Sequence, residues 1–271
     1  MSATLHELFQ IASRTHPGSV REANEDHCAT FFALDCAGLV VADGVSSFNG
    51  GDTASRLAVE VTLEAFLSGD SALPPAKRLY RAVQRANIAV HDLALVVPEL
   101  RSMATTLTAV LLTPSELYAV HVGDCRLYLL RADRLLQLTK DHTVAAQRSR
   151  LGILSRARAR HHPARSTLTR SLGRELIARV DQFSTPIAAE DLLLVCSDGI
   201  HGVLDDAQLL TACLAPTAEG VCDALIAAAN QHGSPDNVTA AVARVSGVVP
   251  PRSDQPGLLS ALNRRFRQRA R

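Results

Sequence analysis

Hydrophobic residues recur along this chain with two different periods, and each period predicts a different kind of element. Short apolar runs at 29–34 and 38–41 predict strands. Apolar residues then recur at helical spacing from 52 to 65, and again over a longer stretch from Leu79 to Val97 that follows two prolines. The first part of the chain therefore predicts two strands followed by two helices.

The period changes beyond residue 105. Short apolar runs separated by Pro, Gly and Asp are typical of a β-meander, and they lie at 106–112, 117–122, 125–130 and 135–138. Later runs predict a strand from Leu192, helices over 206–214 and 218–231, and a last strand over 238–245. Helices and strands grouped in this way favour an α+β fold with layered sheets over alternating βαβ units.

Length and composition favour a cytoplasmic protein with a large core. The chain has 271 residues, of which 47% are hydrophobic, so it can form one large domain or two small ones. No apolar run reaches the ~18 residues of a spanning helix, so we expect no membrane span. The first residues lack a basic region followed by an apolar one, so we also expect no signal peptide.

The cysteines indicate a reducing compartment. Six are present, mostly inside apolar runs and without a Cys-x-x-Cys pair: Cys28, Cys36, Cys125, Cys196, Cys213 and Cys222. We interpret them as small buried hydrophobic residues rather than as a disulfide framework. None lies in the glycine-rich basic loop that a phosphate-attacking thiolate would need.

Aspartate ends several of the predicted strands or comes just before them. The run 39–42 ends in Asp43-Gly44, the run 192–197 ends in Asp198-Gly199, and Asp236 precedes the last strand. One Asp-Gly pair alone is ordinary turn chemistry. Three aspartates placed in this way, with few basic residues beside them, predict a site for hard divalent cations held by oxygen ligands.

An arginine-rich segment separates the meander from the later strand. No acidic residue occurs between Asp141 and Glu175, whereas eight arginines do: Arg148, Arg150, Arg156, Arg158, Arg160, Arg165, Arg170 and Arg174. The segment is too polar for the core. It is either a solvated helical face or a flap that attracts acidic or phosphorylated partners. Nucleic acid is poorly supported, because the segment has no aromatic residue for base stacking.

The composition changes again in the tail, residues 248–271. Prolines interrupt its first part, and five arginines accompany apolar residues from Leu258 onward. The tail is either a loosely attached basic segment or a short amphipathic helix that binds an acidic partner or an anionic membrane surface.

Eight short motifs occur in an order that resembles one known family. They are Arg21-Glu22-Ala23-Asn24-Glu25-Asp26, Ala42-Asp43-Gly44, Ala104-Thr105-Thr106-Leu107, Val122-Gly123-Asp124-Cys125-Arg126-Leu127-Tyr128, Leu138-Thr139-Lys140-Asp141-His142-Thr143, Leu168-Thr169-Arg170-Ser171-Leu172-Gly173, Ser197-Asp198-Gly199 and Pro235-Asp236-Asn237-Val238-Thr239. Together they resemble the PP2C family of metal-dependent serine/threonine phosphatases, over about residues 10–247. The chain resembles compact bacterial members, whose usual counterparts are Ser/Thr kinases and their substrates.

The resemblance implies a fold and a domain organisation. The expected fold is a four-layer α-β-β-α sandwich, two antiparallel sheets flanked by helices. One phosphatase domain would occupy residues 1–247 and the basic tail would follow it. We expect a monomer that binds phosphoproteins, with no nucleic-acid partner.

The resemblance also implies a metal centre with Mg²⁺ or Mn²⁺: two core ions and a third, weaker one. Asp43 would bridge the core ions, Asp198 and Asp236 would bind the first, and the Gly44 carbonyl the second. Glu25 and Asp26 would act through or beside bound waters. Asp124 would hold the third ion together with Asp198, and Arg21 would bind the substrate phosphate.

This centre would hydrolyse phosphoserine and phosphothreonine by a metal-activated bridging water, without a covalent intermediate. Two cations lower the pKa of the shared water and neutralise the phosphoryl oxygens. The planar guanidinium of Arg21 matches the geometry of a phosphate.

One position departs from the family. Many members place His, or in bacteria often Met, directly after Asp-Gly, whereas Val45 stands here. Valine cannot donate a proton to the leaving alkoxide. A metal-bound water or another side chain such as His27 or His142 would have to serve as the general acid.

Two other function classes stay open at this point. The fold could be a non-catalytic module that binds phosphoproteins, although such a module has no need for Asp43, Asp198 and Asp236. A two-metal nuclease or phosphodiesterase is suggested only by the basic segment and the tail.

Overall fold

The computed structural model describes residues 4–45 and 50–248. Residues 46–49, in the loop after Asp43-Gly44, and the tail beyond Val248 lie outside the described residues. The helix predicted for the tail therefore stays a prediction.

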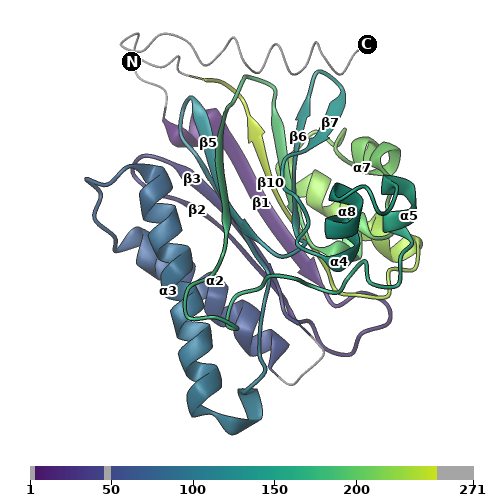
Figure 1. Ribbon diagram of the computed structural model, residues 1–271. Helices are drawn as coiled ribbons and strands as arrows, with labels where there is room; N and C mark the ends of the chain where they lie inside the picture. The colour runs from purple at the N-terminus through teal and green to yellow at the C-terminus, as the bar shows by residue number, and fades with distance from the viewer. Residues whose placement is uncertain (1–3, 46–49, 249–271) are drawn as a thin grey trace.

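Two antiparallel sheets of five strands each form the centre of the molecule (Figure 1). In strand order, the first sheet contains β1 (Phe9–His16), β10 (Val238–Val245), β9 (Leu192–Cys196), β6 (Arg126–Arg131) and β7 (Arg134–Gln137). The second contains β2 (Asp26–Phe32), β3 (Ala37–Asp43), β4 (Leu107–Leu112), β5 (Glu116–Val122) and β8 (Asp181–Pro186).

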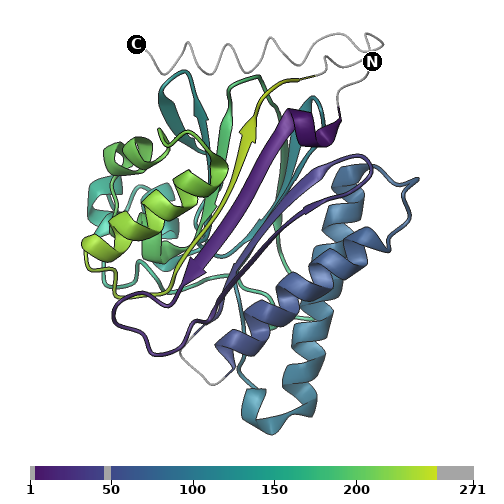
Figure 2. The same cartoon turned by 180° about the vertical axis from the view of Figure 1, so that it is seen from behind.

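Helices cover the outer face of each sheet. The long helices α2 (Gly51–Leu67) and α3 (Pro75–Val96) pack on the second sheet, while α6 (Asp198–His201), α7 (Asp206–Ala212) and α8 (Ala218–Gln231) lie on the side of the first sheet. Seen from behind, β1 (purple) runs beside β10, next to α8, which packs on both strands (Figure 2). The shorter elements are α1 (Leu5–Leu8), the 3₁₀ helix η1 (Pro98–Leu100), α4 (Val144–Arg150) and α5 (Arg156–Arg160).

Three layers of apolar side chains hold the four layers of structure together. Successive residues of a strand point to opposite faces, and β3 shows the result: Leu39 and Val41 pack between the sheets, whereas Val40 and Ala42 pack under α2 and α3. On the first sheet, Leu193 faces the space between the sheets and Leu194 faces the α6–α8 side. The predicted α-β-β-α sandwich is confirmed.

Most elements lie where the apolar periods predict them, but the predicted β-meander is divided between the sheets: β4 pairs with β5 in the second sheet and β6 with β7 in the first. Two strands were missed. α8 and β10 have the predicted bounds. β1 pairs with β10 along its whole length, but most of its residues are half-buried or exposed, so they show no continuous apolar run. β8 is an edge strand of the second sheet and ends in Pro186. Edge strands tolerate polar residues and proline, so neither strand carries a clear sequence signal.

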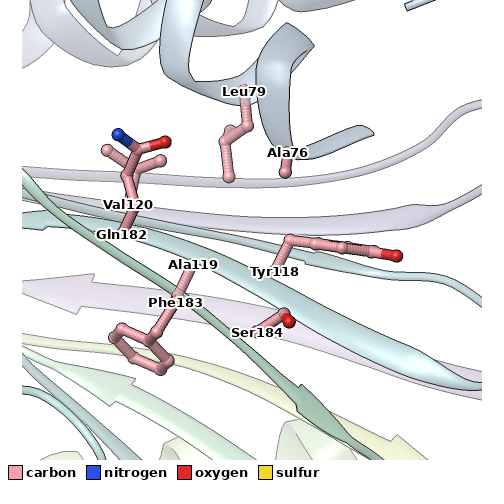
Figure 3. Close-up of a pocket in the computed structure, with 8 residues that line it drawn as sticks. All are labelled: Ala76, Leu79, Tyr118, Ala119, Val120, Gln182, Phe183 and Ser184. Carbon is pink, nitrogen blue, oxygen red and sulfur yellow. The ribbon is translucent and has the colours of Figure 1, made fainter. Parts of the chain in front are cut away.

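A cavity of about 230 Å³ lies on the outer face of the second sheet, away from the predicted site. It is lined by Ala76, Leu79, Tyr118, Ala119, Val120, Gln182, Phe183 and Ser184. Figure 3 shows Ala76 and Leu79 projecting from α3 toward the strands. None of the predicted site residues lines this cavity, and its polar groups form no cluster of acids or bases.

Among the described residues, no helix has both the length and the apolar character needed to cross a membrane.

Candidate metal centre

The end of β3 places Asp43 at the rim of the space between the sheets. Asp43 lies on the same strand face as Leu39 and Val41, which pack between the sheets. Its backbone is fixed on both sides: its N–H donates to Thr106 Oγ1 over 3.0 Å, and its carbonyl accepts from Thr105 Oγ1 over 2.8 Å. The apolar strand therefore ends in a carboxylate that is held firmly in place.

Asp26 is the direct partner of Asp43 in the register of β2 and β3. Directly opposed residues of an antiparallel pair point to the same face, with Cβ atoms about 4.5–5.5 Å apart. Asp26 is buried, and one of its oxygens accepts a hydrogen bond of 2.7 Å from Ser197 Oγ. Ser197 precedes Asp198, so this bond joins the two sheets beside two predicted ligands.

Asp198 begins the short helix α6, directly after β9. Gly199 must be glycine here, because a Cβ atom would lie 1.9 Å from the carbonyl oxygen of Asn237. Ser234 Oγ also donates to the Gly199 carbonyl over 2.8 Å. The Asp-Gly turn is thus packed directly against the loop that carries Asp236.

Asn237 connects that loop to the segment that carries Arg21 and Glu25. Its amide nitrogen donates to the carbonyls of Pro17 and Ala23, and its amide oxygen accepts from the N–H of Glu25 over 2.8 Å. Arg21 in turn donates to Asp236 Oδ2 over 3.0 Å. The predicted phosphate-binding arginine and a predicted metal ligand are therefore in contact.

Glu25 and Gly44 meet at the start of α2. The N–H of Gly44 donates to the Glu25 carbonyl over 3.1 Å. A Cβ atom added to Gly51 would lie 2.6 Å from a Glu25 carboxylate oxygen, and one added to Gly44 would lie 2.3 Å from the Gly51 carbonyl. Glycine at both positions allows this close approach.

Asp124 lies in a turn that two histidines hold. Preceding it, Gly123 has a φ of 105°, which favours glycine. The N–H of Gly123 donates to His142 Nδ1 over 3.1 Å, and the Asp124 carbonyl accepts from His201 Nε2 over 2.9 Å. Sequence reasoning assigned no role to Ser197, Asn237 or His201, whose hydrogen bonds join segments far apart in the chain.

Burial is the main cause of the raised pKa values in the carboxylate cluster, and neighbouring carboxylates add to it. Burial, and then the charges of neighbouring aspartates that include Asp198, raise the pKa of Asp26 to about 7 and that of Asp43 well above its ordinary value. Burial and the charge of Asp236 raise the pKa of Asp198 to about 6, although nearby arginines oppose this. The pKa of Asp124 is also raised, by burial and then by Asp198. The predicted ligands are thus close enough together to repel one another.

This arrangement fits hard divalent cations. A cluster of buried and half-buried carboxylates carries a repulsion that positive charge would remove, and its donors are the oxygens that Mg²⁺ and Mn²⁺ prefer. Within residues 4–45 and 50–248, no three His, Cys, Asp or Glu side chains converge as a ready-made ligand set for one ion. That is compatible with Mg²⁺, which usually keeps several waters and takes only one or two carboxylates.

Both candidate histidines for the general acid have polar partners within the protein. His142 is buried, and its Nε2 lies 3.2 Å from Asp181 Oδ2 while Nδ1 accepts from Gly123. His27 faces the opposite side of β2 from Asp26 and lies 3.0 Å from Ser55 Oγ in α2. His27 is thus engaged on the α2 side of β2, and His142 is engaged beside Gly123, next to Asp124.

Comparison with known proteins points to one family. The family model for protein phosphatase 2C matches residues 16–232. The serine/threonine phosphatase stp of Listeria innocua is 34% identical over 231 residues, which cover 83% of this chain and 92% of that protein.

Solved structures give the same result. The serine/threonine phosphatase PstP/Ppp of Mycobacterium tuberculosis superimposes with a TM-score of 0.79 and 33% identity, covering 88% of this chain and 99% of that one. A catalytic domain of PstP in complex with two manganese ions has a TM-score of 0.77 and 32% identity, covering 88% of this chain and 98% of that one. The family match and these similarities extend over most of the chain, so it belongs to the protein phosphatase 2C family.

Proposed function

We propose that this protein hydrolyses phosphoserine and phosphothreonine in phosphoproteins, with Mg²⁺ or Mn²⁺ bound by the carboxylate cluster. The observation that carries the proposal is a set of direct contacts: Asp26 pairs with Asp43, and Ser197, beside Asp198, donates to Asp26. Gly199 also packs against the Asn237 carbonyl, beside Asp236, so these aspartates lie at one end of the space between the sheets. Membership of the protein phosphatase 2C family supports the reaction type. The manganese ions of the similar PstP structure support the choice of metal.

The residues of this chain would hold the metals and the substrate in distinct ways. Two core ions would be bound by the carboxylates of Asp43, Asp198 and Asp236 and by the Gly44 carbonyl. Glu25 and Asp26 would act through or beside waters bound to these ions. Asp124 supplies a third and weaker site. When bound, the ions would activate a water for in-line attack on phosphorus, so no covalent enzyme intermediate is needed.

Arg21 would bind the phosphate group of the substrate. It contacts Asp236 in the structure, and its side chain is 40% exposed, so it can turn toward a ligand in solvent. Its guanidinium would bind two phosphate oxygens and compensate their charge. Val45 has no proton to donate, so the proton for the leaving alkoxide would have to come from a water or from another side chain of the site.

Biological partners follow from the reaction. We propose phosphoproteins, including Ser/Thr kinases and their substrates, for a monomeric enzyme in the cytoplasm. Free cysteines at all six positions, five of them buried, support a reducing compartment.

The decisive experiment measures phosphate release from a phosphothreonine peptide and from p-nitrophenyl phosphate. We expect no turnover in excess chelator, recovery with Mn²⁺ or Mg²⁺, and little with Ca²⁺, which favours longer bonds and looser geometry. Full activity in chelator would refute the proposal. Metal binding without turnover would indicate the non-catalytic module, and DNA cleavage by the same preparation would indicate the nuclease.

A further inference from the structure

Charge is distributed unevenly along this chain. The arginine-rich segment, residues 142–174, has eight arginines and no acidic residue, whereas the whole chain has a net charge of only +1. The remaining residues therefore carry a net charge of −7. Such a separation creates a local positive field that the total charge conceals.

The arginine-rich segment is attached beside the carboxylate cluster. At its start, the N–H of His142 donates to the Gly123 carbonyl over 2.7 Å, next to Asp124. Thr143, near its start, pairs with Leu168, near its end, in an isolated antiparallel bridge. Farther along, the positive charge of Arg165 lowers the pKa of Asp198, against burial and the charge of Asp236, which raise it. The segment therefore lies beside the carboxylate cluster both at its start and near Arg165.

Several arginines of the segment have partners within the molecule. Arg160 lies 3.0 Å from Asp206 at the start of α7, and Arg170 lies 2.9 Å from Asp181. Arg150 donates to the Asp141 carbonyl over 3.1 Å. These contacts attach the arginine-rich segment to the rest of the protein, which carries the net negative charge, and α5 lies beside α7 in Figure 1.

Arg156 and Arg158 are different. They lie on α5, which begins after the capping residue Ser155, and both are exposed. Neither makes a side-chain hydrogen bond or an ion pair within residues 4–45 and 50–248. Two cations are thus held on a short helix with their charge directed to solvent.

We propose that Arg156 and Arg158 bind acidic side chains that flank the phosphorylated residue, so that the enzyme prefers acidic phosphopeptides. The inference rests on the proposed phosphatase function. A phosphoserine carries about −1.5 to −2 charges near neutral pH, and flanking Asp or Glu residues extend that charge along the peptide. A peptide fits better than a nucleic acid, because the segment has no aromatic side chain on which bases could stack.

The test compares kcat/KM for three phosphothreonine peptides whose flanking residues are acidic, neutral or basic. We expect the wild-type protein to prefer the acidic peptide at low salt. The double variant Arg156→Gln/Arg158→Gln should lose about three- to tenfold on the acidic peptide, since each exposed ion pair contributes modestly. Added salt should reduce the preference of the wild type, because exposed charges are screened beyond ~8 Å at physiological ionic strength.

A charge reversal and a matched control make the test specific. Arg156→Glu/Arg158→Glu should shift the preference toward the basic peptide. Arg81→Gln/Arg85→Gln removes two exposed arginines of α3, outside the arginine-rich segment, and should keep the wild-type preference. Circular dichroism on each variant would show that the fold is retained.

The remaining outcomes contradict the inference. Equal losses on all three peptides would mean that Arg156 and Arg158 shape the site rather than select the peptide. An unchanged peptide preference would mean that the two arginines are only a solvated helical face. If single-stranded DNA inhibited the reaction more strongly than the acidic peptide at physiological salt, the surface would be assigned to nucleic acid. If wild-type protein with Mn²⁺ hydrolysed no peptide at all, the proposed function itself would fail.

Discussion

Asp26 and Asp43 lie directly opposite each other in the pairing of β2 with β3, on the face that lines the space between the sheets. Like charges opposed in this way destabilise a sheet, and burial adds to the cost because it removes water from the carboxylates. The folded chain therefore keeps an arrangement that is unfavourable for stability and favourable for binding cations. Removing either charge should therefore reduce metal binding and turnover without reducing the stability of the fold.

The first prediction concerns Asp43→Asn. The amide keeps the volume but removes one metal-binding charge, so we expect turnover to be abolished. In excess chelator the variant should be at least as stable as the wild type, because the pKa of Asp43 is raised by burial and by neighbouring aspartates. Phosphate release and thermal unfolding with and without Mn²⁺ would measure both effects.

Asp236→Asn should likewise abolish turnover with the fold intact. The matched control is Asp133→Asn, in the turn between β6 and β7, where a φ of 58° suits asparagine equally well. This control should keep full activity and the rise in Tm on adding Mn²⁺. Near wild-type turnover of Asp43→Asn at saturating metal would disprove the assigned bridging role.

The second prediction concerns Arg21. Replacing it by Ala should remove about 1.5–3 kcal/mol of transition-state stabilisation, the usual contribution of a hydrogen bond to a charged group. This corresponds to a roughly ten- to 150-fold lower kcat/KM. Arg21→Lys should recover little, because an ammonium group cannot bind two phosphate oxygens in one plane. Arg14→Ala, an exposed arginine of β1 that pairs with Asp223, provides the comparison.

A loss confined to metal affinity, with kcat/KM restored at high Mn²⁺, would show instead that Arg21 serves Asp236. The contact between Arg21 and Asp236 makes this the main alternative.

How far the sequence predicted these features depends on how local each signal is. β3 and Asp43 were predictable, because an apolar run that ends in Asp-Gly specifies both the strand and its polar end within six residues of the printed chain. β8 was not predictable, since it is a polar edge strand that is stabilised by pairing with β5. Its neighbours in space decide its conformation, and the local pattern does not.

The same distinction applies to the site. The motifs predicted the carboxylates one by one, but not the hydrogen bonds that hold them. Ser197 contacts Asp26 across 171 positions of the chain, and Asn237 reaches the Glu25 backbone across 212. Serine and asparagine are common loop residues, so only the folded arrangement distinguishes these two from any others.

The third prediction is a dependence of stability on pH that His121 causes. This ring is fully buried, with Nδ1 at 2.8 Å from Thr108 Oγ1 and Nε2 at 3.2 Å from the Lys140 carbonyl. Burial, and then the neighbouring His142, lower the pKa of His121 from 6.5 to about 4. The unfolded chain therefore binds a proton at higher pH than the folded chain does. The stabilising effect of the neutral ring is complete above pH 6.5 and is lost as the pH falls toward 4.

Urea unfolding of the wild type and of His121→Gln in excess chelator would check this. The variant should be less stable near pH 7.5, and the difference should shrink by roughly 1 kcal/mol near pH 5.5, since one pKa unit corresponds to about 1.4 kcal/mol. A difference that stays constant between the two pH values would exclude His121 as the titrating group.

The last prediction concerns the ion pair between Arg126 and Asp141. Arg126 Nε and Nη2 donate to the two carboxylate oxygens over 3.0 and 2.7 Å. Only 14% and 15% of the two side chains are exposed. Burial would raise the pKa of Asp141, but the guanidinium outweighs it and holds that pKa below its ordinary value.

This pair joins the turn that carries Asp124 to the start of the arginine-rich segment. Removing one partner leaves the other charge buried and unpaired, so we expect Arg126→Met or Asp141→Asn to cost about 3–5 kcal/mol. The double variant should cost less than the sum of the two, because it leaves no unpaired charge. The loss of stability in Arg126→Lys should be smaller, since lysine keeps the charge and loses only the two-pronged geometry.

The exposed pair of Arg14 and Asp223, 3.3 Å apart, should contribute about 0.2–1 kcal/mol in the same kind of double-mutant cycle. Urea unfolding of all variants gives the coupling energies, and strictly additive losses for Arg126 and Asp141 would show that the pair does not act as a unit.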